Sequence, residues 1–500
     1  MKLYRFFLPA VLGAAVSSSF GTEFPNPYPA PPPGVRLTPE TPLSPSVNGA
    51  RIVGATPGAR VLFQVPVSGE RPMKIQAAGL PSGLRMDSRG LVTGTAPAKK
   101  GEYKVKIQAS NRHGKDAIAV DSLGKEGVPG APKEGFDAIP MWVADMNFAT
   151  VPTVRQEMIE RAGHPAFGYF DPREEYFTSI IKWQETRNGV KGLEKKHIGY
   201  ENGVLGGLIS AVSAFSAPGD AILLHSPTYI GFTRCIENSG RKIILSPLKK
   251  DENGVWRMDY EDMEAKIQKN RIHLAVFCNP HNPCGRVWEK DEIEKAMEVY
   301  KRNSCVVISD EIWSDLMLNG SKHTPTQSVS EDARDRTIAL YAPSKTFNLA
   351  GLIGSYHIIY NDYLRDRVLA QSSKCHYNEM NLMSMYALIG AYRPEGYEWV
   401  DELCEVLSEN VNYAYDYIQN HFDGVEVSKP QGTYMLFLDC TKWCEKHEES
   451  LDELLRAGWD VGVAWQDGRP FHGSCSIRMN LASPKSQIEK AFERLSQYVF

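Results

Sequence analysis

Short runs of consecutive apolar residues alternate with amphipathic stretches from about residue 138 onward. Uninterrupted runs of this length are typical of strands whose two faces are both buried in a parallel sheet. Between the third and fourth runs, residues 291–300 place apolar side chains at helical spacing, which predicts a helix between two strands. The runs are 221–225, 242–246, 273–277, 305–309, 337–341 and 355–359. The pattern therefore predicts an α/β domain built on a mostly parallel sheet.

The pattern changes again from about residue 395. A helical stretch at 408–422 is followed by two β-like stretches, 432–439 and 475–483. These elements predict a smaller α+β domain at the carboxyl end of the chain. We therefore assign about 150–394 to a large domain, and about 138–149 together with 395–500 to a small domain.

The front of the chain has a different organisation. Residues 47–120 alternate short β-rich stretches with turn signals such as MDSRG, about every ten residues, which predicts a small all-β sandwich. This part resembles the Ig-like modules attached to secreted bacterial glycosidases, and we favour a spacer over a ligand-binding module. Residues 22–46 carry nine prolines and predict an extended linker, and residues 121–137 predict a second linker.

Two features give opposite indications of the compartment. Residues 1–21 carry basic residues, a short apolar run and then small residues, which is typical of a signal peptide cleaved near Ser19 or Gly21. The apolar run is too short to span a membrane, so we expect no membrane partner after cleavage. All nine cysteines lie from Cys235 onward, mostly in apolar runs, which is typical of core thiols in a reducing compartment. The leader thus indicates a secreted or periplasmic protein, whereas the cysteines are typical of a cytoplasmic enzyme, and they predict no metal site.

Charge and composition exclude other partners. The chain of 500 residues has a formal net charge of -4, with 42% hydrophobic and 23% charged residues and no long basic run. This balance is that of a globular multidomain protein and argues against nucleic acid as a partner.

Polar residues follow directly after four of the predicted strands. The carboxyl ends of parallel strands meet at one edge of a sheet, where ligands bind in open α/β folds. A glycine-rich turn, ENGVLGG, also precedes an apolar helix, and its backbone N–H groups can bind a phosphate. The residues after the strands are Tyr229, Asn282, Asp310 and Lys345.

These residue types together fit one kind of cofactor. A lysine amine can form a Schiff base with a carbonyl group. A buried carboxylate can keep a pyridine nitrogen protonated, an aromatic side chain can stack on the ring, and an amide can bond a ring hydroxyl. The combination predicts pyridoxal 5'-phosphate (PLP).

Residues 138–500 resemble the fold-type-I, PLP-dependent aminotransferase superfamily. Within it they look most like the C–S lyases of the cystathionine β-lyase type, also called cysteine-S-conjugate β-lyases. The phrases that carry the resemblance are spread over the whole region. They are IPMWVADMNF, HPAFGYF, SPTYIGF, NPHNPCGRVW, SDEIWSD, APSKTFNLAG and IRMNLASP.

The resemblance implies roles at the cofactor ring. Lys345 would carry the cofactor as a Schiff base and later act as the acid and base at the substrate Cα. Asp310 would pair with the pyridine nitrogen, and Asn282 would bond the ring hydroxyl. Tyr229 would stack on the ring and assist proton transfer.

The resemblance also implies contacts to phosphate and substrate. Val204 and Leu205 would donate backbone N–H groups to the phosphate, and Tyr169 would reach the phosphate of a neighbouring subunit in a homodimer. Arg478 would bind the α-carboxylate of an amino-acid substrate, since a planar guanidinium suits a carboxylate, and Trp142 would also contact the substrate.

The sequence departs from the family pattern at several positions. Cys284 stands where the motif commonly has Thr, and Trp313, expected beside the cofactor, stands where relatives often have His or Tyr. Ala342 lacks a phosphate-binding hydroxyl, and no arginine follows Lys345 after eight residues, which favours the lyase branch. The amino-terminal arm that helps to cover the site in the family is largely replaced by residues 121–137.

The leading interpretation is β-elimination from a sulfur-substituted amino acid, such as cystathionine or a cysteine S-conjugate, to a thiol, pyruvate and ammonia. An aminotransferase on the same scaffold is the first alternative, since both activities need Lys345, Asp310 and Arg478. A secreted binding or scaffold protein with a passenger enzyme half is the second, and the intact Lys345 and Asp310 argue against it.

Overall fold

Two compact units make up the chain, one from Met1 to Ala117 and the other from Ile118 to Phe500. The computed structural model describes residues 46–47, 55–65, 67–68, 74–99, 101, 103, 105–110, 118–374 and 377–500. The predicted leader and nearly all of the proline-rich linker therefore lie outside the described residues.

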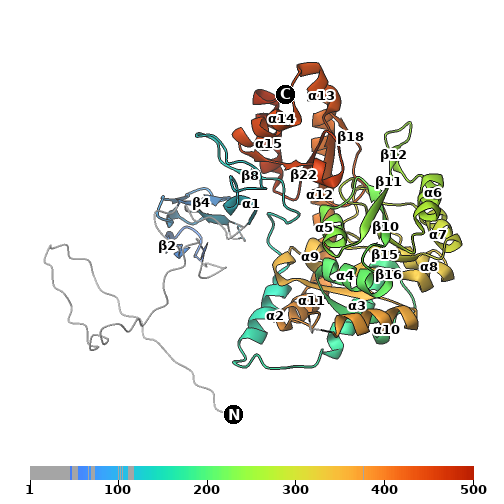
Figure 1. The fold of residues 1–500 in the computed structure, drawn as a ribbon. Coiled ribbons are helices and arrows are strands. Elements are labelled where there is room, and N and C mark those ends of the chain that lie inside the picture. Colours follow the sequence, from blue (N-terminus) through green and yellow to red (C-terminus); the bar gives the residue numbers. More distant parts are fainter. Residues whose placement is uncertain are drawn as a thin grey trace, which may run out of the picture. The chain divides into compact units, whose positions relative to one another are not determined.

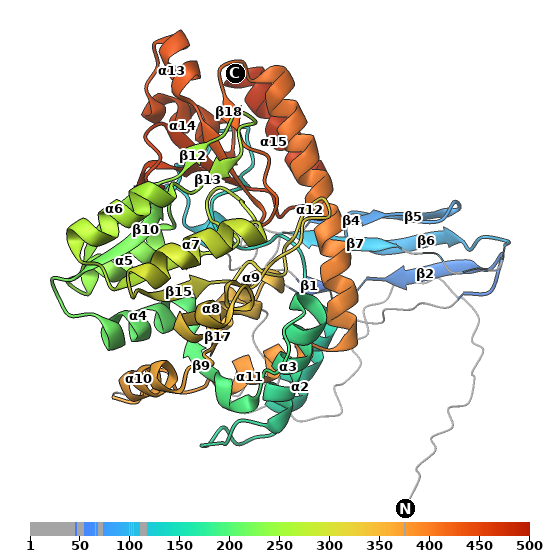
Figure 2. The ribbon, with the colours of Figure 1, turned by 90° about the vertical axis from the view of Figure 1, so that its right-hand side faces the viewer.

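The described part of the first unit contains only β-strands and turns, as the sequence predicts (Figure 2). The turn MDSRG connects two of these strands, and the carboxylate of Asp87 accepts the backbone N–H groups of Arg89 and Leu91, both at 2.9 Å. Val65, Ile75 and Val92 are buried. The antiparallel sheets are β2-β6-β5, β4-β7 and β1-β3, formed by β1 (Ser46–Val47), β2 (Arg60–Gln64), β3 (Val67–Ser68), β4 (Lys74–Ala78), β5 (Leu84–Met86), β6 (Leu91–Thr95) and β7 (Lys106–Ser110).

The second unit is built on a seven-stranded sheet in the order β11-β10-β14-β15-β16-β17-β9 (Figure 1). Strand β17 alone runs against its neighbours, so the predicted mostly parallel sheet is confirmed. Each of the six predicted strands forms within one residue of its expected bounds. The sheet also contains β9 (Ile198–Asn202), which no predicted run covers. The other strands of the sheet are β10 (Ala221–Ser226), β11 (Lys242–Pro247), β14 (Leu274–Cys278), β15 (Val306–Asp310), β16 (Thr337–Tyr341) and β17 (Gly354–Ile358).

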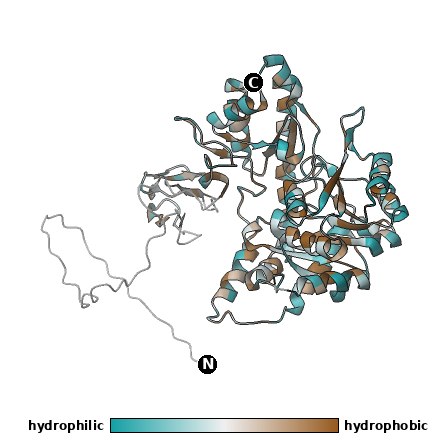
Figure 3. Cartoon of the chain, in the orientation of Figure 1, coloured by the Kyte–Doolittle hydropathy of each residue, from teal (hydrophilic) through white to brown (hydrophobic). Residues whose placement is uncertain are grey.

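Helices cover both faces of this sheet, because alternate strand residues point to opposite faces and nearly all of them are apolar. In β10, Leu224 packs towards one group of helices and Leu223 towards another. Figure 3 shows the central strands as mostly hydrophobic, while the surrounding helices carry both colours. The first group is α4 (Gly203–Phe215), α5 (Ile230–Asn238) and α10 (Asp362–Ser372), and the second is α6 (Tyr260–Asn270), α7 (Lys290–Arg302) and α8 (Glu331–Arg336).

Three further helices form a separate cluster beyond β9 and β17. Helix α2 (Pro152–Ala162) packs against α11 (Leu382–Ala391), and α3 (Glu174–Asn188) contributes the buried Trp183. Trp183 stacks on Tyr392 with 4.3 Å between ring centroids. The cluster also contains Tyr341 at the end of β16 and Phe347, so it supports the chain segment on both sides of Lys345.

The small domain has its own antiparallel sheet, β18-β19-β22-β21. The long helix α12 (Pro394–His421) and α15 (Lys485–Tyr498) pack against it, and α12 runs from the small domain down to the side of α2 and α3 (Figure 2). Residues 139–140 form β8, which pairs with β20 (Val463–Ala464). The strands of the antiparallel sheet are β18 (Glu426–Val427), β19 (Met435–Asp439), β21 (Gln466–Asp467) and β22 (Ser476–Asn480), and α13 (Thr441–His447) and α14 (Leu451–Asp460) complete the domain.

The segment predicted as a linker before residue 138 packs along the small domain. The backbone N–H of Lys133 donates to Asp460, and the Phe136 ring lies 5.4 Å from that of Tyr498. Asp137 is ion-paired with Lys490 and Arg494. Partial burial opposes ionisation of Asp137, but these two cations lower its pKa to about 2. We call residues 118–137 the strap.

We predict that the strap stabilises the second unit. A chain that begins at Ile118 should unfold in urea like the second unit of the full chain, as followed by far-UV circular dichroism. A chain that begins at Ile139 should lose up to about 2 kcal/mol, because the partly buried Phe136 side chain contributes at most roughly 1.5 kcal/mol and an exposed ion pair up to about 1 kcal/mol. Phe136→Ala in the full chain is the matched control, and it should lose most of this free energy of unfolding. Equal stability of the two truncated chains would show that the strap does not stabilise the second unit.

Candidate active site

Four predicted site residues follow strands β10, β14, β15 and β16 at one edge of the sheet. Asp310 ends β15 and lies opposite Cys278 at the end of β14, which places Asn282 a few residues further on. Lys345 lies in α9 (Pro343–Thr346), directly after β16. Tyr229 is the residue before α5 and follows β10. The parallel register thus brings all four chain segments to one place.

Lys345 lies in a confined environment that combines an aromatic ring with charged and polar groups. Its Nζ donates to the carbonyl oxygen of Ala144 at 2.7 Å and lies 5.8 Å from the ring centroid of Trp313. Burial lowers the pKa of Lys345 to about 8; the nearby Arg478 contributes to this, and Asp145 and Asp310 oppose it. About one tenth of this amine is therefore uncharged at pH 7, far more than for a lysine of ordinary pKa.

Asp310 is buried, with only 4% of its surface exposed. Its Oδ1 accepts the backbone N–H of Ile312 at 3.1 Å, and no donor among the described residues bonds Oδ2. Burial raises the pKa of Asp310 to about 7, and the adjacent Glu311 contributes in the same direction. Such a carboxyl group is suited to a cationic N–H donor, which would compensate for its loss of hydration.

Arg478 is held in the middle of β22 by three acceptors. Its Nη2 donates to the carbonyl of Trp142 at 3.0 Å and to Oε1 of Gln466 at 2.6 Å, and its Nη1 donates to Oδ1 of Asn282 at 3.3 Å. The guanidinium also lies 4.3 Å from the ring centroid of Phe471. Burial lowers the pKa of Arg478 to about 10, so it stays charged at neutral pH.

Two buried polar atoms near this arginine have no partner among the described residues. They are Nε of Arg478 and the hydroxyl of Tyr434. Tyr434 packs against Trp313 with 4.7 Å between ring centroids, and burial raises its pKa well above the usual value. Unsatisfied buried donors are rare and costly, so their presence beside Lys345 indicates a place for a polar ligand.

Tyr229 is positioned by the start of α5. Its ring meets Phe232 edge-on at 5.3 Å, and burial raises the pKa of its hydroxyl. A Cβ at Gly231 would lie 2.3 Å from a ring carbon of Tyr229, so only glycine leaves the ring in this position. SPTYIGF therefore needs its glycine in order to place the tyrosine.

The turn ENGVLGG forms the first turn of α4, which begins at Gly203 with φ of 72°. Val204 and Leu205 lie in this first turn, where backbone N–H groups have no intrahelical acceptor and the helix dipole favours an anion. The first turn contains no acidic residue. These features fit a phosphate group at this end of the helix.

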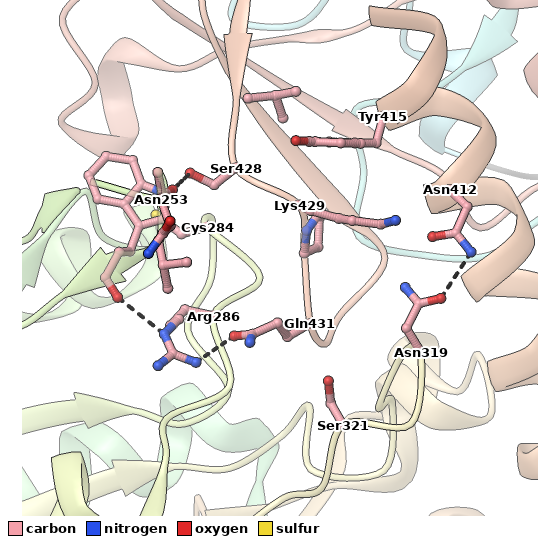
Figure 4. Close-up of a pocket in the computed structure, with 15 residues that line it drawn as sticks. Asn253, Cys284, Arg286, Asn319, Ser321, Asn412, Tyr415, Ser428, Lys429 and Gln431 are labelled. Carbon is pink, nitrogen blue, oxygen red and sulfur yellow. Dashed lines mark hydrogen bonds between the residues drawn. The ribbon is translucent and has the colours of Figure 1, made fainter. Parts of the chain in front are cut away.

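Two predicted site residues, Tyr169 and Trp142, and the motif position Cys284 lie differently from the others. Tyr169 is fully exposed in the segment between α2 and α3. The indole N–H of Trp142 donates to the carbonyl of Ala119 in the strap at 2.9 Å, so only its backbone carbonyl reaches Arg478. Cys284 lines a separate cavity of about 440 Å³ with Arg286 and other residues, and none of the predicted site residues lines it (Figure 4).

Sequence reasoning missed Gln466 and Tyr434. Gln466 lies opposite Arg478 because β21 pairs with β22, but β21 is only two residues long and has no recognisable pattern. Tyr434 lies in the predicted β-like stretch 432–439 and is buried in the structure. In the sequence, a tyrosine in an apolar stretch indicates only core packing.

The residues present fit PLP. A carboxyl group with a free oxygen, a confined lysine amine, a positioned tyrosine ring and a helix amino terminus lie around one site, and each matches one part of that cofactor. No group of metal-binding side chains is found among the described residues. Within the same part of the chain, no helix is both long and apolar enough to cross a membrane.

A family model described as "Aminotransferase class I and II" matches residues 138–495. The chain belongs to this family. The predicted resemblance and the PLP dependence are thereby confirmed. A second model, described as "Putative Ig domain", matches residues 29–121 and supports the predicted Ig-like fold of the first unit.

Several similar proteins are lyases by name, and others are named aspartate aminotransferase. Cystathionine beta-lyase PatB of Bacillus subtilis is 35% identical over 362 residues, covering 72% of this chain and 92% of the relative. The PLP-bound C–S lyase from Staphylococcus hominis is 27% identical with a TM-score of 0.69, covering 78% of this chain and 96% of the other. Cystalysin from Treponema denticola, which contains PLP, is 28% identical with a TM-score of 0.69, covering 76% and 95%.

We predict that the amine of Lys345 in the cofactor-free enzyme reacts as a base of pKa about 8. Trinitrobenzenesulfonate labels only uncharged amines, so labelling of Lys345, measured by peptide mapping, should increase with pH with a midpoint near 8 rather than near 10.5. Arg478→Leu removes a neighbouring positive charge, so its midpoint should lie at higher pH. A wild-type midpoint near that of exposed lysines would contradict the described environment of Lys345.

Proposed function

We propose that residues 138–500 catalyse β-elimination from a sulfur-substituted amino acid, such as cystathionine, to a thiol, pyruvate and ammonia. The observation that carries the proposal is the confined amine of Lys345, whose pKa responds to the charges of both Arg478 and Asp310. The names of the relatives, cystathionine beta-lyase and C–S lyase, support the choice of reaction.

When bound, PLP supplies a carbonyl group that binds the substrate amine and a ring that accepts the electron pair left at Cα. Arg478 binds the substrate α-carboxylate, and Gln466 with the Trp142 carbonyl fixes the plane of its guanidinium. Asp310 keeps the pyridine nitrogen protonated, since its free Oδ2 has no other donor among the described residues.

Lys345 moves the protons. Its Nζ removes the proton from the substrate Cα, and its pKa of about 8 is close to the operating pH, which is the best value for a general base. The same group can return the proton to the departing sulfur. The Ala144 carbonyl, which accepts a hydrogen bond from Nζ, and the adjacent Trp313 ring limit where the amine can move.

An aminotransferase activity is the alternative, since the family model bears that name. It would need the same three residues, but no group would leave from Cβ, and the proton from Cα would be returned to the cofactor instead. The position eight residues after Lys345 is Ile353, whose side chain is 57% exposed, so no cation binds phosphate there. This departure favours the lyase. A scaffold with an inactive enzyme half has no use for three buried ionisable groups at one site.

The decisive experiment gives the PLP-loaded full chain L-cystathionine and measures all products. We expect pyruvate, ammonia and homocysteine in equal amounts. Asp310→Asn keeps the size of the side chain but not its charge, and turnover should decrease roughly 100-fold or more, since charge stabilisation of this kind contributes about 3 kcal/mol. Amino transfer to a keto acid without pyruvate would support the aminotransferase instead.

We also propose that the enzyme is a homodimer in which Tyr169 completes the site of the other subunit. Tyr169 is fully exposed on a segment whose Phe167 is also 60% exposed, which is unusual for two aromatic side chains on a free surface. A partner subunit would bury both. The proposed phosphate contact of Tyr169 rests on the family resemblance.

A subunit-mixing experiment tests this arrangement. Lys345→Ala and Tyr169→Ala chains are each predicted to be nearly inactive. A refolded mixture should regain activity, because one site of each mixed dimer has both residues intact. The mixture should stay inactive if Tyr169 serves its own subunit, or if the chain is a monomer by light scattering.

A further inference from the structure

Three cysteines lie together at one end of the small-domain sheet, away from the residues of the candidate active site. Cys440 follows β19, Cys475 directly precedes β22, and Cys444 lies in α13. Sγ of Cys444 and Sγ of Cys475 are 3.6 Å apart. Nothing in the proposed reaction uses them.

The fold fixes this arrangement through the backbone. Asp439 pairs with Ser476 across β19 and β22, so the next residues, Cys440 and Cys475, also face each other, and the N–H of Cys440 donates to the carbonyl of Cys475 at 2.8 Å. The N–H of Cys444 donates to the carbonyl of Cys440 at 2.9 Å, which places Cys444 one helical turn above. Main-chain bonds therefore hold the backbones of the three cysteines close together.

The environment of the cluster favours reaction between thiols over other uses. No group of side chains suited to a metal ion is found among the described residues, and this includes these three cysteines. Cys440 and Cys444 are buried, whereas Cys475 is partly exposed, so an external reagent reaches Cys475 first. Burial also raises the pKa of Cys444, which keeps this thiol protonated until a reaction partner forms beside it.

We propose that Cys444 and Cys475 are a redox-active dithiol that closes to an intramolecular disulfide. The oxidant is a low-molecular-weight disulfide. The thiolate of Cys475 attacks one of its sulfurs, which forms a mixed disulfide and releases one thiol. The thiolate of Cys444, having lost its proton to water, then attacks Sγ of Cys475 and releases the second thiol. Two protein thiols are oxidised, and one external disulfide is reduced to two thiols.

Closure requires only a small movement. A disulfide bond is about 2.05 Å long, so the two sulfurs must approach by roughly 1.5 Å, which side-chain rotation can supply. The bond would join α13 to the start of β22, the strand that carries Arg478, and would close a loop of about 30 residues. Such a loop closure restricts the unfolded chain and stabilises the small domain.

The dithiol would be compatible with both compartments that the sequence indicates, the oxidising one of the leader and the reducing one of the core thiols. The leader indicates export to an oxidising compartment, where the pair would be closed, and the remaining described cysteines are free thiols that need no partner. In a reducing compartment the same pair would remain open.

The test uses the full chain, incubated with oxidised or with reduced glutathione, then denatured, alkylated and mapped by mass spectrometry. We expect the oxidised sample to lose two alkylated cysteines, with a linked peptide pair that contains Cys444 and Cys475 and no glutathione adduct. Its melting temperature should rise by a few degrees over that of the reduced sample. Cys444→Ser should instead trap glutathione on Cys475, whereas Cys404→Ser, a matched change elsewhere in the unit, should still form the link.

Wild-type mapping alone decides the proposal if the serine variants do not fold. Alkylation of both Cys444 and Cys475 after oxidation would overturn it. So would a link from Cys440 to Cys475, a stable glutathione adduct on the wild-type chain, or a link between two chains on a non-reducing gel.

Discussion

The site depends on the burial of two cations and one carboxyl group within a single small volume. Lys345 and Arg478 repel each other there, and this repulsion adds to burial in lowering the pKa of Lys345. Burial shifts Asp310 in the opposite direction, to a pKa of about 7. Both groups can therefore change protonation near neutral pH, which neither would do in water. Arg478 keeps its charge and can bind a carboxylate.

Neighbouring polar contacts keep the chain segments near Lys345 in place although Lys345 and Arg478 repel each other. Thr346, next to Lys345, donates to the buried carboxylate of Asp315 at 2.9 Å, and Trp183 donates to the other oxygen of the same group at 3.0 Å. The side chain of Asn480 donates to the carbonyls of Val143 and Asp145, at 2.5 and 2.6 Å. This second contact fixes the segment whose Ala144 carbonyl meets Lys345, so the small domain directly controls the position of the amine.

The sequence could predict the elements whose pattern is local. Six strands of the large sheet are apolar runs that the sequence predicts, whereas β9, with the sequence IGYEN, has no such run. Asp310 ends one of the predicted strands and Lys345 follows another, so their convergence follows from parallel strand order. Gln466 could not be found, because its position depends on the pairing of a two-residue strand. The sequence predicts a linker for residues 121–137 because their polar, glycine-rich composition gives no sign of contacts such as that of Phe136 with Tyr498. The side-chain direction of Trp142 likewise depends on the strap and on no local motif.

The central claim is that Lys345 carries the cofactor, and chemical trapping tests it most directly. The full chain would be incubated with PLP, reduced with sodium borohydride, digested and mapped by mass spectrometry. The account predicts one phosphopyridoxyl group per chain, on the peptide that contains Lys345, and addition of an amino-acid substrate before reduction should remove it. A label distributed over surface lysines, or no label on Lys345, would contradict the account.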